Sequence, residues 1–288
     1  MQFGLTLKKS LFFLSFLTLT NLAQASDFHS PRTDALGGAG HASPLLSDAI
    51  YLNPSFSSFM EVHSLSFNYL AYGGGVTPDG NDFRGRNFNI SVLDGTADSL
   101  FQAGVAYTRR DDANIVHIGA SKSLFKKLGI GIGSKFIFPT DGSGNRFSDG
   151  NLSLTGLITT WFQAAFIIDN LFQAAPQLGF NREYLLGTKF NFTPYFMVYL
   201  DPHYAPNVPS DQNPWGYQAG IEIPFFSDFF LRLGQFRSST IPYQGRRGNG
   251  YGLGGGWVGP KISFDYSFSK ALSPIASNSH NFGMTIFF

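Results

Sequence analysis

The residue types that perform catalysis or hold metal ions occur in this sequence, but their spacing suits neither task. Cys is absent, and the six His residues are scattered without the spacing of metal ligands. Ser is too abundant for a Ser–His pair to be recognised without geometry. The glycine-rich residues 36–40 lack the strand–helix unit that surrounds a nucleotide-binding loop. We therefore predict no catalytic residue, no metal site and no cofactor, and we expect the protein not to be an enzyme.

Charged side chains of both signs occur inside segments in which polar and apolar residues alternate. If these segments are strands with one wet face, the charges point into a shared polar interior. There they either line a conduit, or they pair with one another and hold a plug, and both interpretations stay open. The residues concerned are Lys135, Glu183, Lys189, Glu222, Arg232 and Asp265.

The composition indicates why a wet interior is expected. The 288-residue chain is 43% hydrophobic and 16% aromatic but only 14% charged, and its mean hydropathy is −0.02. Water-soluble domains carry about 25% charged residues, whereas a helical membrane protein is far more apolar. The aromatic content also excludes a disordered chain. Apolar residues that alternate with small polar ones explain this combination.

The first 25 residues are predicted to be a signal peptide. Lys8 and Lys9 precede the apolar residues 11–19, and the Ala-Gln-Ala sequence at residues 23–25 supplies the cleavage site. The apolar stretch is too short to cross about 30 Å of hydrocarbon. Removing Lys8 and Lys9 from the 20 Lys and Arg residues leaves 18, against 19 acidic residues. We expect an exported protein with no nucleic-acid partner.

Period-two alternation recurs along the rest of the chain. It is clearest at residues 261–269, where Ile, Phe, Tyr and Phe alternate with Lys, Ser and Asp. Another such segment includes Tyr195, Met197 and Tyr199, which we expect on its lipid-facing side. Each segment taken singly also fits a strand of a soluble sandwich.

The number of such segments favours a membrane barrel. The uncharged residues 151–168 are too polar for a transmembrane helix and divide into two strands. With them we count about fourteen strands, an even number typical of bacterial barrels. We therefore predict an all-β fold, a closed antiparallel transmembrane barrel of about 14 strands formed by residues 61–288.

The connections between the predicted strands alternate in length. Longer loops are predicted at residues 73–85, 109–113, 139–150, 169–182, 201–214, 237–250 and 271–280. Short turns are predicted near residues 94–95, 125–126, 160, 193–194, 226–227 and 259–260. Membrane barrels have short periplasmic turns and longer outer loops. The alternation therefore predicts a bacterial outer-membrane protein, in contact with outer-membrane lipid, with both termini in the periplasm.

The carboxyl-terminal residues support this interpretation. Phe288 is the last residue, and apolar residues precede it at two-residue steps. This pattern resembles the aromatic-terminated signal that the outer-membrane assembly machinery reads, which predicts that machinery as a partner. The residues of the signal are Phe282, Met284, Ile286 and Phe288.

Residues 26–60 do not alternate, and we name this segment the hatch. It contains a Leu-Gly-Gly-Ala-Gly run, an Asp-Ala pair and an Asn-Pro-Ser run. Here the sequence resembles the FadL-type channels for hydrophobic compounds and their PorV/PorQ-like relatives. The resemblance implies a barrel of about fourteen strands whose amino-terminal hatch lies in the lumen. The hatch and gating residues it implies are Asp34, Leu36, Gly37, Gly38, Gly40, Asp48, Asn53 and Pro54.

The hatch also has a physical rationale. A barrel of this width leaves an open lumen unless a segment fills it. Asp48 is placed to cap a short helix that ends before Pro54. Inward glycines either leave room for the hatch or only bend the strands, and both interpretations stay open. These glycines are Gly129, Gly131, Gly133, Gly252, Gly254 and Gly256.

Two functions follow from the resemblance. The first is a channel that passes small hydrophobic or amphipathic solutes through a lumen gated by the hatch. The alternative is a PorV-like barrel that does not transport and serves as a scaffold for an exported or periplasmic protein. A general porin and an outer-membrane hydrolase are less favoured.

Overall fold

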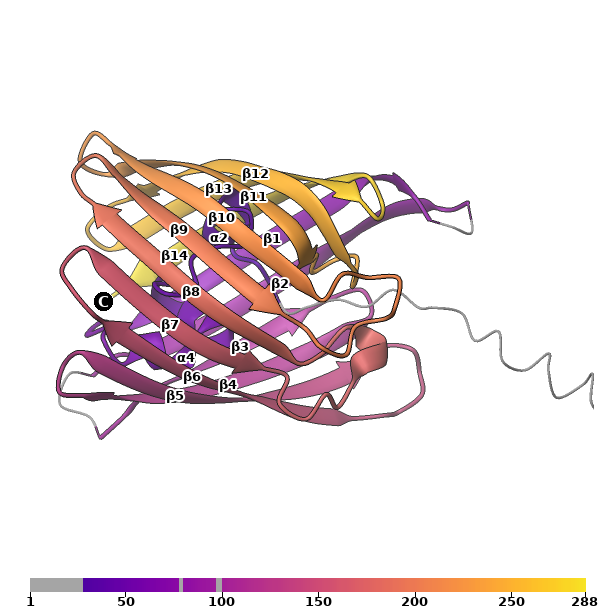
Figure 1. Ribbon diagram of the computed structural model, residues 1–288, viewed down its shortest axis with the longest axis horizontal. Helices are drawn as coiled ribbons and strands as arrows, with labels where there is room; N and C mark the ends of the chain where they lie inside the picture. The colour runs from indigo at the N-terminus through magenta and orange to yellow at the C-terminus, as the bar shows by residue number, and fades with distance from the viewer. Residues whose placement is uncertain (1–27, 78–79, 97–99) are drawn as a thin grey trace, which may run out of the picture.

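The computed structural model describes residues 28–77, 80–96 and 100–288, which form a closed antiparallel barrel around a short helical segment (Figure 1). Each strand pairs with its sequence neighbours, and β14 pairs with β1 to close the barrel. The predicted fold class is confirmed. The predicted signal peptide, residues 1–25, lies outside the described residues.

The strands are β1 (Ser64–Val76), β2 (Asp82–Asp94), β3 (Gln102–Arg109), β4 (Ala113–Leu124), β5 (Leu128–Pro139), β6 (Phe147–Leu157), β7 (Phe162–Asp169), β8 (Glu183–Phe192), β9 (Phe196–Tyr204), β10 (Trp215–Phe225), β11 (Phe229–Thr240), β12 (Arg247–Val258), β13 (Ile262–Ser273) and β14 (Ser277–Phe287).

The alternation of the sequence maps onto the two faces of the barrel wall. In β13 the side chains of Phe264 and Tyr266 are exposed on the outside, whereas Ser267 and Ser269 are buried inside. Large exposed apolar side chains recur in this way on the other strands. A closed barrel satisfies its backbone hydrogen bonds without water. An exterior with this many exposed apolar side chains requires contact with lipid. The barrel therefore spans a membrane. Among the described residues, no helix has the length and apolarity to cross a bilayer.

One strand faces the opposite way from the prediction. Met197 and Tyr199 of β9 are buried in the interior, and Phe196 and Leu200 face outward. The reason is the hatch, because Tyr199 and Met197 pack against Leu36. The aromatic ring at position 199 therefore serves an interior contact and not the lipid boundary.

The predicted alternation of connection lengths is only partly right. Connections 140–146, 170–182, 205–214 and 241–246 are longer than turns 125–127, 193–195 and 259–261. However, 110–112 and 274–276 are as short as these turns, because the neighbouring strands extend into the predicted loops. Connection 95–101 is longer than predicted. The start of β1 and the end of β14 lie at the end with the short turns (Figure 1).

The hatch contains short helical elements joined by irregular backbone. They are α2 (Pro31–Ala35), η1 (Leu46–Asp48), α3 (Ala49–Leu52) and α4 (Pro54–Ser57). Ser30 caps α2, since its Oγ accepts the Thr33 N–H, and Pro31 fits the first turn. The predicted cap at Asp48 is wrong, because its carboxylate instead accepts the Tyr51 hydroxyl at 2.7 Å. As predicted, α3 ends before Pro54, which begins α4.

Candidate functional site

The hatch lies inside the barrel and divides its contacts between two parts of the wall (Figure 1). Helix α2 packs against β11 to β14, and α3 and α4 pack against β3 to β6. Hatch residues such as Leu36, Ala39 and Asn53 have no exposed surface. The hatch therefore fills the lumen, and the contacts that hold it there define the candidate site.

A buried ion-pair network joins α2 to the wall. The Arg32 guanidinium donates to Glu222 of β10 through Nε at 2.9 Å and Nη2 at 3.2 Å. On the other side, Arg232 of β11 donates to Glu222 at 2.6 Å and to Asp265 of β13 at 2.5 Å. Tyr199 also accepts a hydrogen bond from Arg32 at 2.7 Å. Two cations and two anions thus balance within one enclosed cluster.

A second connection forms at Asp201 of β9. One carboxylate oxygen accepts the backbone N–H groups of Gly40 and His41, at 2.8 and 2.9 Å, and contacts His41 Nδ1 at 2.9 Å. The other oxygen accepts the Thr188 N–H at 3.0 Å. At this point the pairing between β8 and β9 is interrupted, between Leu185 and Lys189. Asp201 therefore replaces part of the strand ladder and holds the glycine-rich turn of the hatch.

The Asn-Pro-Ser run makes the third connection. The Asn53 amide donates to His41 O at 2.7 Å and to Thr155 Oγ1 of β6 at 2.8 Å. The Ser55 N–H donates to Ser153 Oγ at 2.9 Å. These hydrogen bonds join the two halves of the hatch to each other and to the wall. They give Asn53 and Ser55 a structural role that their sequence positions alone do not reveal.

Two buried carboxyl groups lie within the hatch. Asp34 accepts a hydrogen bond from Ser267 Oγ at 2.9 Å, and no ion pair to it occurs among the described residues. Burial raises the pKa of Asp34 to about 7. Burial also raises the pKa of Asp48 to about 6, against the lowering effect of the Tyr51 hydrogen bond. Both groups therefore favour the protonated form more than a carboxyl group in water does.

Small residues allow the hatch to approach the wall. A side chain at Gly220 or Gly234 would collide with Leu36, and one at Gly131 would collide with Ser55. Gly37 and Gly38 have φ values of 67° and 89°, which most other residues avoid.

The inward glycines predicted to leave room for the hatch divide into two groups. Positions 129, 131, 252 and 254 do face the hatch. Gly133 and Gly256 instead face the wall side chains of Asn151 and Asp265, so room for the hatch does not explain these two glycines.

The predicted lumenal charges fall into separate groups. Glu222, Arg232 and Asp265 belong to the network around Arg32. Lys189 donates to Ser43 Oγ of the hatch at 3.2 Å. Lys135 contacts Asp169 at 2.7 Å, and Glu183 contacts Arg247 at 2.8 Å. In this state each charge has a partner, and a role in lining a conduit stays a prediction.

Sequence reasoning missed Arg32 and Asp201. Arg32 is the one Lys or Arg among the described hatch residues. A single cation in this segment could have indicated an anionic partner on the wall. Asp201 was assigned to a loop, because the sequence did not show that β9 continues to Tyr204.

The predicted insertion-signal residues lie on the last strand. Phe282 is 53% exposed toward lipid, and Phe288 is 71% exposed. The Phe288 ring stacks on His63 with centroids 5.9 Å apart. Their recognition by the assembly machinery stays a prediction.

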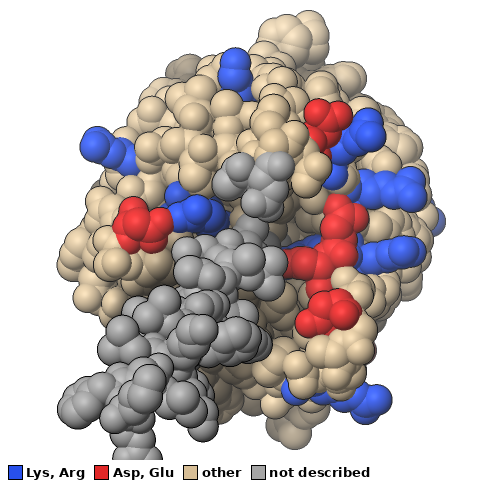
Figure 2. Space-filling model, turned by 90° about the vertical axis from the view of Figure 1, so that its right-hand side faces the viewer, with Lys and Arg blue, Asp and Glu red and all other residues tan. Residues whose placement is uncertain are grey.

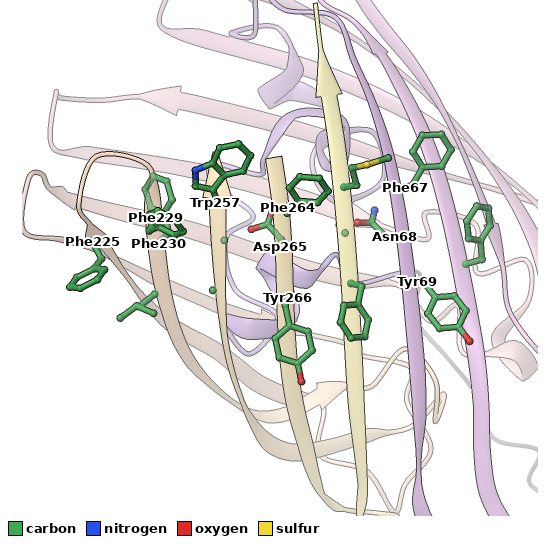
Figure 3. A pocket seen from close by; sticks show the side chains of 17 residues that line it. Phe67, Asn68, Tyr69, Phe225, Phe229, Phe230, Trp257, Phe264, Asp265 and Tyr266 are labelled. Carbon is green, nitrogen blue, oxygen red and sulfur yellow. The ribbon is translucent and has the colours of Figure 1, made fainter. Parts of the chain in front are cut away.

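A cavity of about 730 Å³ forms a groove on the outside of the barrel (Figure 3). Lipid-facing rings such as Tyr69, Trp257, Phe264 and Tyr266 line it. These rings place the outer surface of the groove at the lipid boundary, and Asn68 and Asp265, which face the lumen, also line it. Beside the hatch, two cavities lined by described residues measure only about 50 and 10 Å³.

Comparison with solved structures identifies the architecture. A monoaromatic hydrocarbon channel, CymD, superposes with a TM-score of 0.66 at 12% sequence identity, over 90% of this chain and 97% of the other. The toluene transporter TodX of Pseudomonas putida gives 0.65 at 12% identity, over 92% and 98%. A FadL homologue of Pseudomonas aeruginosa gives 0.60 at 12% identity, over 92% and 99%.

The chain has the FadL-type channel fold. The fold that the Leu-Gly-Gly-Ala-Gly and Asn-Pro-Ser runs suggested is thus confirmed, including an amino-terminal segment in the lumen. No protein-family model and no curated protein sequence matches the chain. Sequence identity to these channels is about one residue in eight. The solute must therefore be inferred from the residues of this chain.

Proposed function

We propose that the protein is a bacterial outer-membrane channel that passes small hydrophobic or amphipathic solutes through its lumen when the hatch moves. The end with the short turns faces the periplasm in this proposal, as in other bacterial barrels. Solved channels with this fold are described as carriers of toluene and other monoaromatic hydrocarbons. A fold alone does not determine function. The proposal therefore depends on the contacts of the hatch.

The observation that carries the proposal is how the hatch is held. Arg32, Gly40, His41, Asn53 and Ser55 all contact the wall through ion pairs or hydrogen bonds. Water can replace each of these bonds when the lumen hydrates. Apolar contacts add to these bonds, since Leu36 clusters with Met197 of the wall, and Ile50 belongs to a cluster with Leu93 of the wall. The strand pairs close the barrel around this segment, so we expect that it can leave the wall without unfolding the barrel.

The small cavities beside the hatch favour a gated channel over a general porin. Volumes of about 50 and 10 Å³ admit water but not an aromatic ring. On this proposal, steady conduction of ions requires a change in the hatch. We expect low conductance in the resting state and transient opening when solute is present.

A reversible tether tests the proposal. Ser57 Oγ of the hatch lies 2.7 Å from Ser121 Oγ of β4, so Ser57→Cys with Ser121→Cys places two thiols for a disulfide. The natural chain has no Cys, which removes competing thiols. The control is Asn89→Cys with Thr108→Cys, which joins β2 to β3 within the wall at directly opposite positions whose side chains are 2.9 Å apart.

The readouts are uptake of radiolabelled toluene by cells and conductance in planar bilayers. Oxidation of the hatch pair should lower both at least about fivefold, reduction should restore them, and the wall pair should have no effect. If the oxidised hatch pair behaves like the wall pair, a gated hatch is wrong.

A further inference from the structure

The outward faces of four strands change from apolar to cationic toward the end of the barrel with the long connections. On β2, the outward side chains of Phe88 and Val92 are apolar, and those of Arg86 and Arg84 follow them toward this end. The outward faces of β3, β11 and β13 change in the same way, and their cations are Arg109, Arg237 and Lys270. We name these five residues the cationic rim. Since the apolar band of a barrel marks the hydrocarbon, the cationic rim lies at the level of the lipid headgroups.

The cationic rim covers one side of the barrel. Its strands belong to the continuous part of the wall from β11 through β14 and β1 to β3. The outward positions of β4 to β10 hold one Lys or Arg, Lys122, which lies near the short turn 125–127. Figure 2 views the end with the long connections and shows Lys and Arg side chains projecting outward at its edge. The cations are therefore gathered on one part of the outer surface.

The members of the cationic rim have no partner within the described parts of the chain. Their side chains make no hydrogen bond or ion pair there, whereas Arg232 and Lys135 inside the lumen each contact a carboxylate. An anion from outside the protein is the natural partner for cations that point away from the barrel.

Two carboxylates lie near the cationic rim. Asp82 is exposed at the loop end of β2, beyond Arg84. Asp111 accepts the Tyr72 hydroxyl at 2.7 Å and the Arg86 N–H at 3.3 Å. Five cations against these two carboxylates leave an excess of three positive charges. A phosphate monoester carries about −1.5 to −2 charges at pH 7, so the excess can neutralise one such group.

Three members of the cationic rim are spaced to bind a single phosphate group. Arg84 and Arg86 are two residues apart on one face of β2, which separates their Cα atoms by about 6.5 Å. Arg109 pairs with Phe88, so it lies diagonally across from Arg86, about 7–8 Å away. The long side chains of all three can converge over this distance. Guanidinium groups bind phosphate oxygens through paired N–H donors.

A hollow of about 590 Å³ leads from these cations down the outer surface. Arg84 and Arg86 line its upper part, and Tyr69 lines it nearer the middle of the membrane. Ala71 lies between Arg86 and His280 in one row of outward residues, and its small side chain leaves this row open. The hollow therefore connects the headgroup level to the apolar surface below.

The groove of Figure 3 continues this path, because Tyr69 lines both the hollow and the groove. Most of the groove lining is aromatic or apolar (Figure 3). Gly255 lies between Leu231 and Tyr266 in one outward row, and its lack of a side chain leaves space between them. An acyl chain whose headgroup is held at the cationic rim can thus lie in the groove.

We propose that the cationic rim and the groove of Figure 3 together bind a phosphorylated lipid of the outer leaflet. Its phosphate lies among Arg84, Arg86 and Arg109, and its acyl chains follow the hollow past Tyr69 into the groove. This inference rests on the orientation given under the proposed function, in which the long connections face outward. It does not depend on transport.

The experiment measures lipid binding to the detergent-solubilised mature protein by native mass spectrometry. The probes are lipid A with two phosphate groups and lipid A stripped of both, which share the same acyl chains. The phosphorylated probe should bind at least about tenfold more tightly. Equal affinity of the two probes, or a protein dimer that forms in place of the lipid complex, overturns the proposal.

Matched double variants test the phosphate contact. Arg84→Gln with Arg86→Gln should lower the affinity for phosphorylated lipid A about tenfold to thirtyfold and leave the stripped lipid unchanged. Lys126→Gln with Lys127→Gln removes the same charge from an exposed short turn at the other end and should have no effect. If the two double variants act alike, the cationic rim is not the phosphate site.

A second pair of variants tests the acyl contact. Gly255→Leu fills the space beside Tyr266 and should weaken both lipids severalfold. Ala164→Leu adds the same bulk to the outward face of β7, away from the groove, and should change neither affinity. Heat-modifiability confirms that each variant is folded. If folded Gly255→Leu binds both lipids as the natural protein does, the groove does not hold the acyl chains.

The two proposals fail separately. Loss of the phosphate preference with intact tether-sensitive uptake refutes only the lipid site. An ineffective tether with an intact phosphate preference refutes only the gated channel.

Discussion

Arg32 of the hatch and Arg232 of the wall donate to the same carboxylate oxygen of Glu222, at 2.9 and 2.6 Å. The two residues are separated by most of the chain, yet one oxygen joins them. Asp265 supplies the second negative charge, so the cluster is neutral only while the hatch is in place. When the hatch leaves, the wall keeps two carboxylates and one guanidinium. This charge imbalance favours return of Arg32 and thus the closed state.

Replacing Arg32 by Met tests this relationship. The variant keeps an unbranched side chain but leaves one of the two carboxylates without a cation. Removing one partner of a buried ion pair costs about 3–5 kcal/mol, here at the expense of the docked hatch. We expect at least tenfold more frequent opening in planar bilayers and faster proteolysis of the hatch, with little change in barrel melting. Arg246→Met, which breaks an exposed ion pair with Asp211, is the control. Similar behaviour of the two variants would contradict the role of Arg32.

Gly234 and Gly255 lie on opposite faces of the wall, and the hatch contacts the wall closely only at Gly234 of these two positions. A Cβ at Gly234 would overlap the Leu36 carbonyl group, whereas a Cβ at Gly255 meets only Phe230 O at 3.4 Å. Gly234→Ala should therefore displace α2 and raise basal conductance severalfold. The overlap is with backbone atoms of the hatch, which cannot move aside as the end of a flexible side chain can. Gly255→Ala should leave conductance unchanged. Equal conductance of the two alanine variants would show that the hatch does not depend on this contact.

The strands were predictable because lipid requires apolar side chains on the outer face of each strand. Residues 261–269 alternate strictly, since every second side chain meets hydrocarbon and the rest meet water. The rule failed at Tyr199, whose ring is apolar enough for lipid but packs on Leu36 inside. It also failed at the loop end, where β11 and β12 continue beyond the apolar belt with polar residues. There alternation no longer marks a strand.

The sequence predicted that the hatch lies in the lumen, but it did not predict which wall residues the hatch contacts. The Leu-Gly-Gly-Ala-Gly and Asn-Pro-Ser runs indicated which segment enters the lumen. Their partners, Glu222, Asp201 and Thr155, lie far away in sequence, and nothing local distinguishes them from other inward polar residues. Asp48 shows a related limit, because a cap position and a hydrogen bond to Tyr51 have the same local sequence. Only the closure of the barrel decides between such alternatives.

Phe288 provides a test of the insertion signal. In the fold it contributes a ring stacked on His63 and one backbone hydrogen bond to His63 O at 3.1 Å. Phe288→Ala keeps the backbone bond, so stability in detergent should change by less than about 1 kcal/mol. If the ring is read during assembly, the folded, heat-modifiable fraction in the outer membrane should fall severalfold. Phe226→Ala removes another exposed ring, 79% exposed in a short turn, and should not lower this fraction. Equal yields for both variants would count against an assembly signal at Phe288.

The buried carboxyl groups of the hatch predict that opening depends on pH. Burial raises the pKa of Asp34 to about 7, above the ordinary value of 3.8, and that of Asp48 to about 6. A raised pKa means that the docked hatch binds these protons more tightly than the displaced hatch does. Docking is therefore strongest below about pH 4 and weakens as the pH rises to about 7, where Asp34 must ionise in place.

Channel opening in planar bilayers should accordingly increase between pH 4.5 and 7.5. Asp34→Asn keeps an acceptor for Ser267 Oγ and cannot ionise, so it should remove most of this increase. The remaining slope should come from Asp48, below about pH 6. Asp228→Asn, in an exposed turn, should retain the full dependence. Opening that decreases with rising pH, or an unchanged slope in Asp34→Asn, would show that the charge state of Asp34 is not coupled to hatch docking.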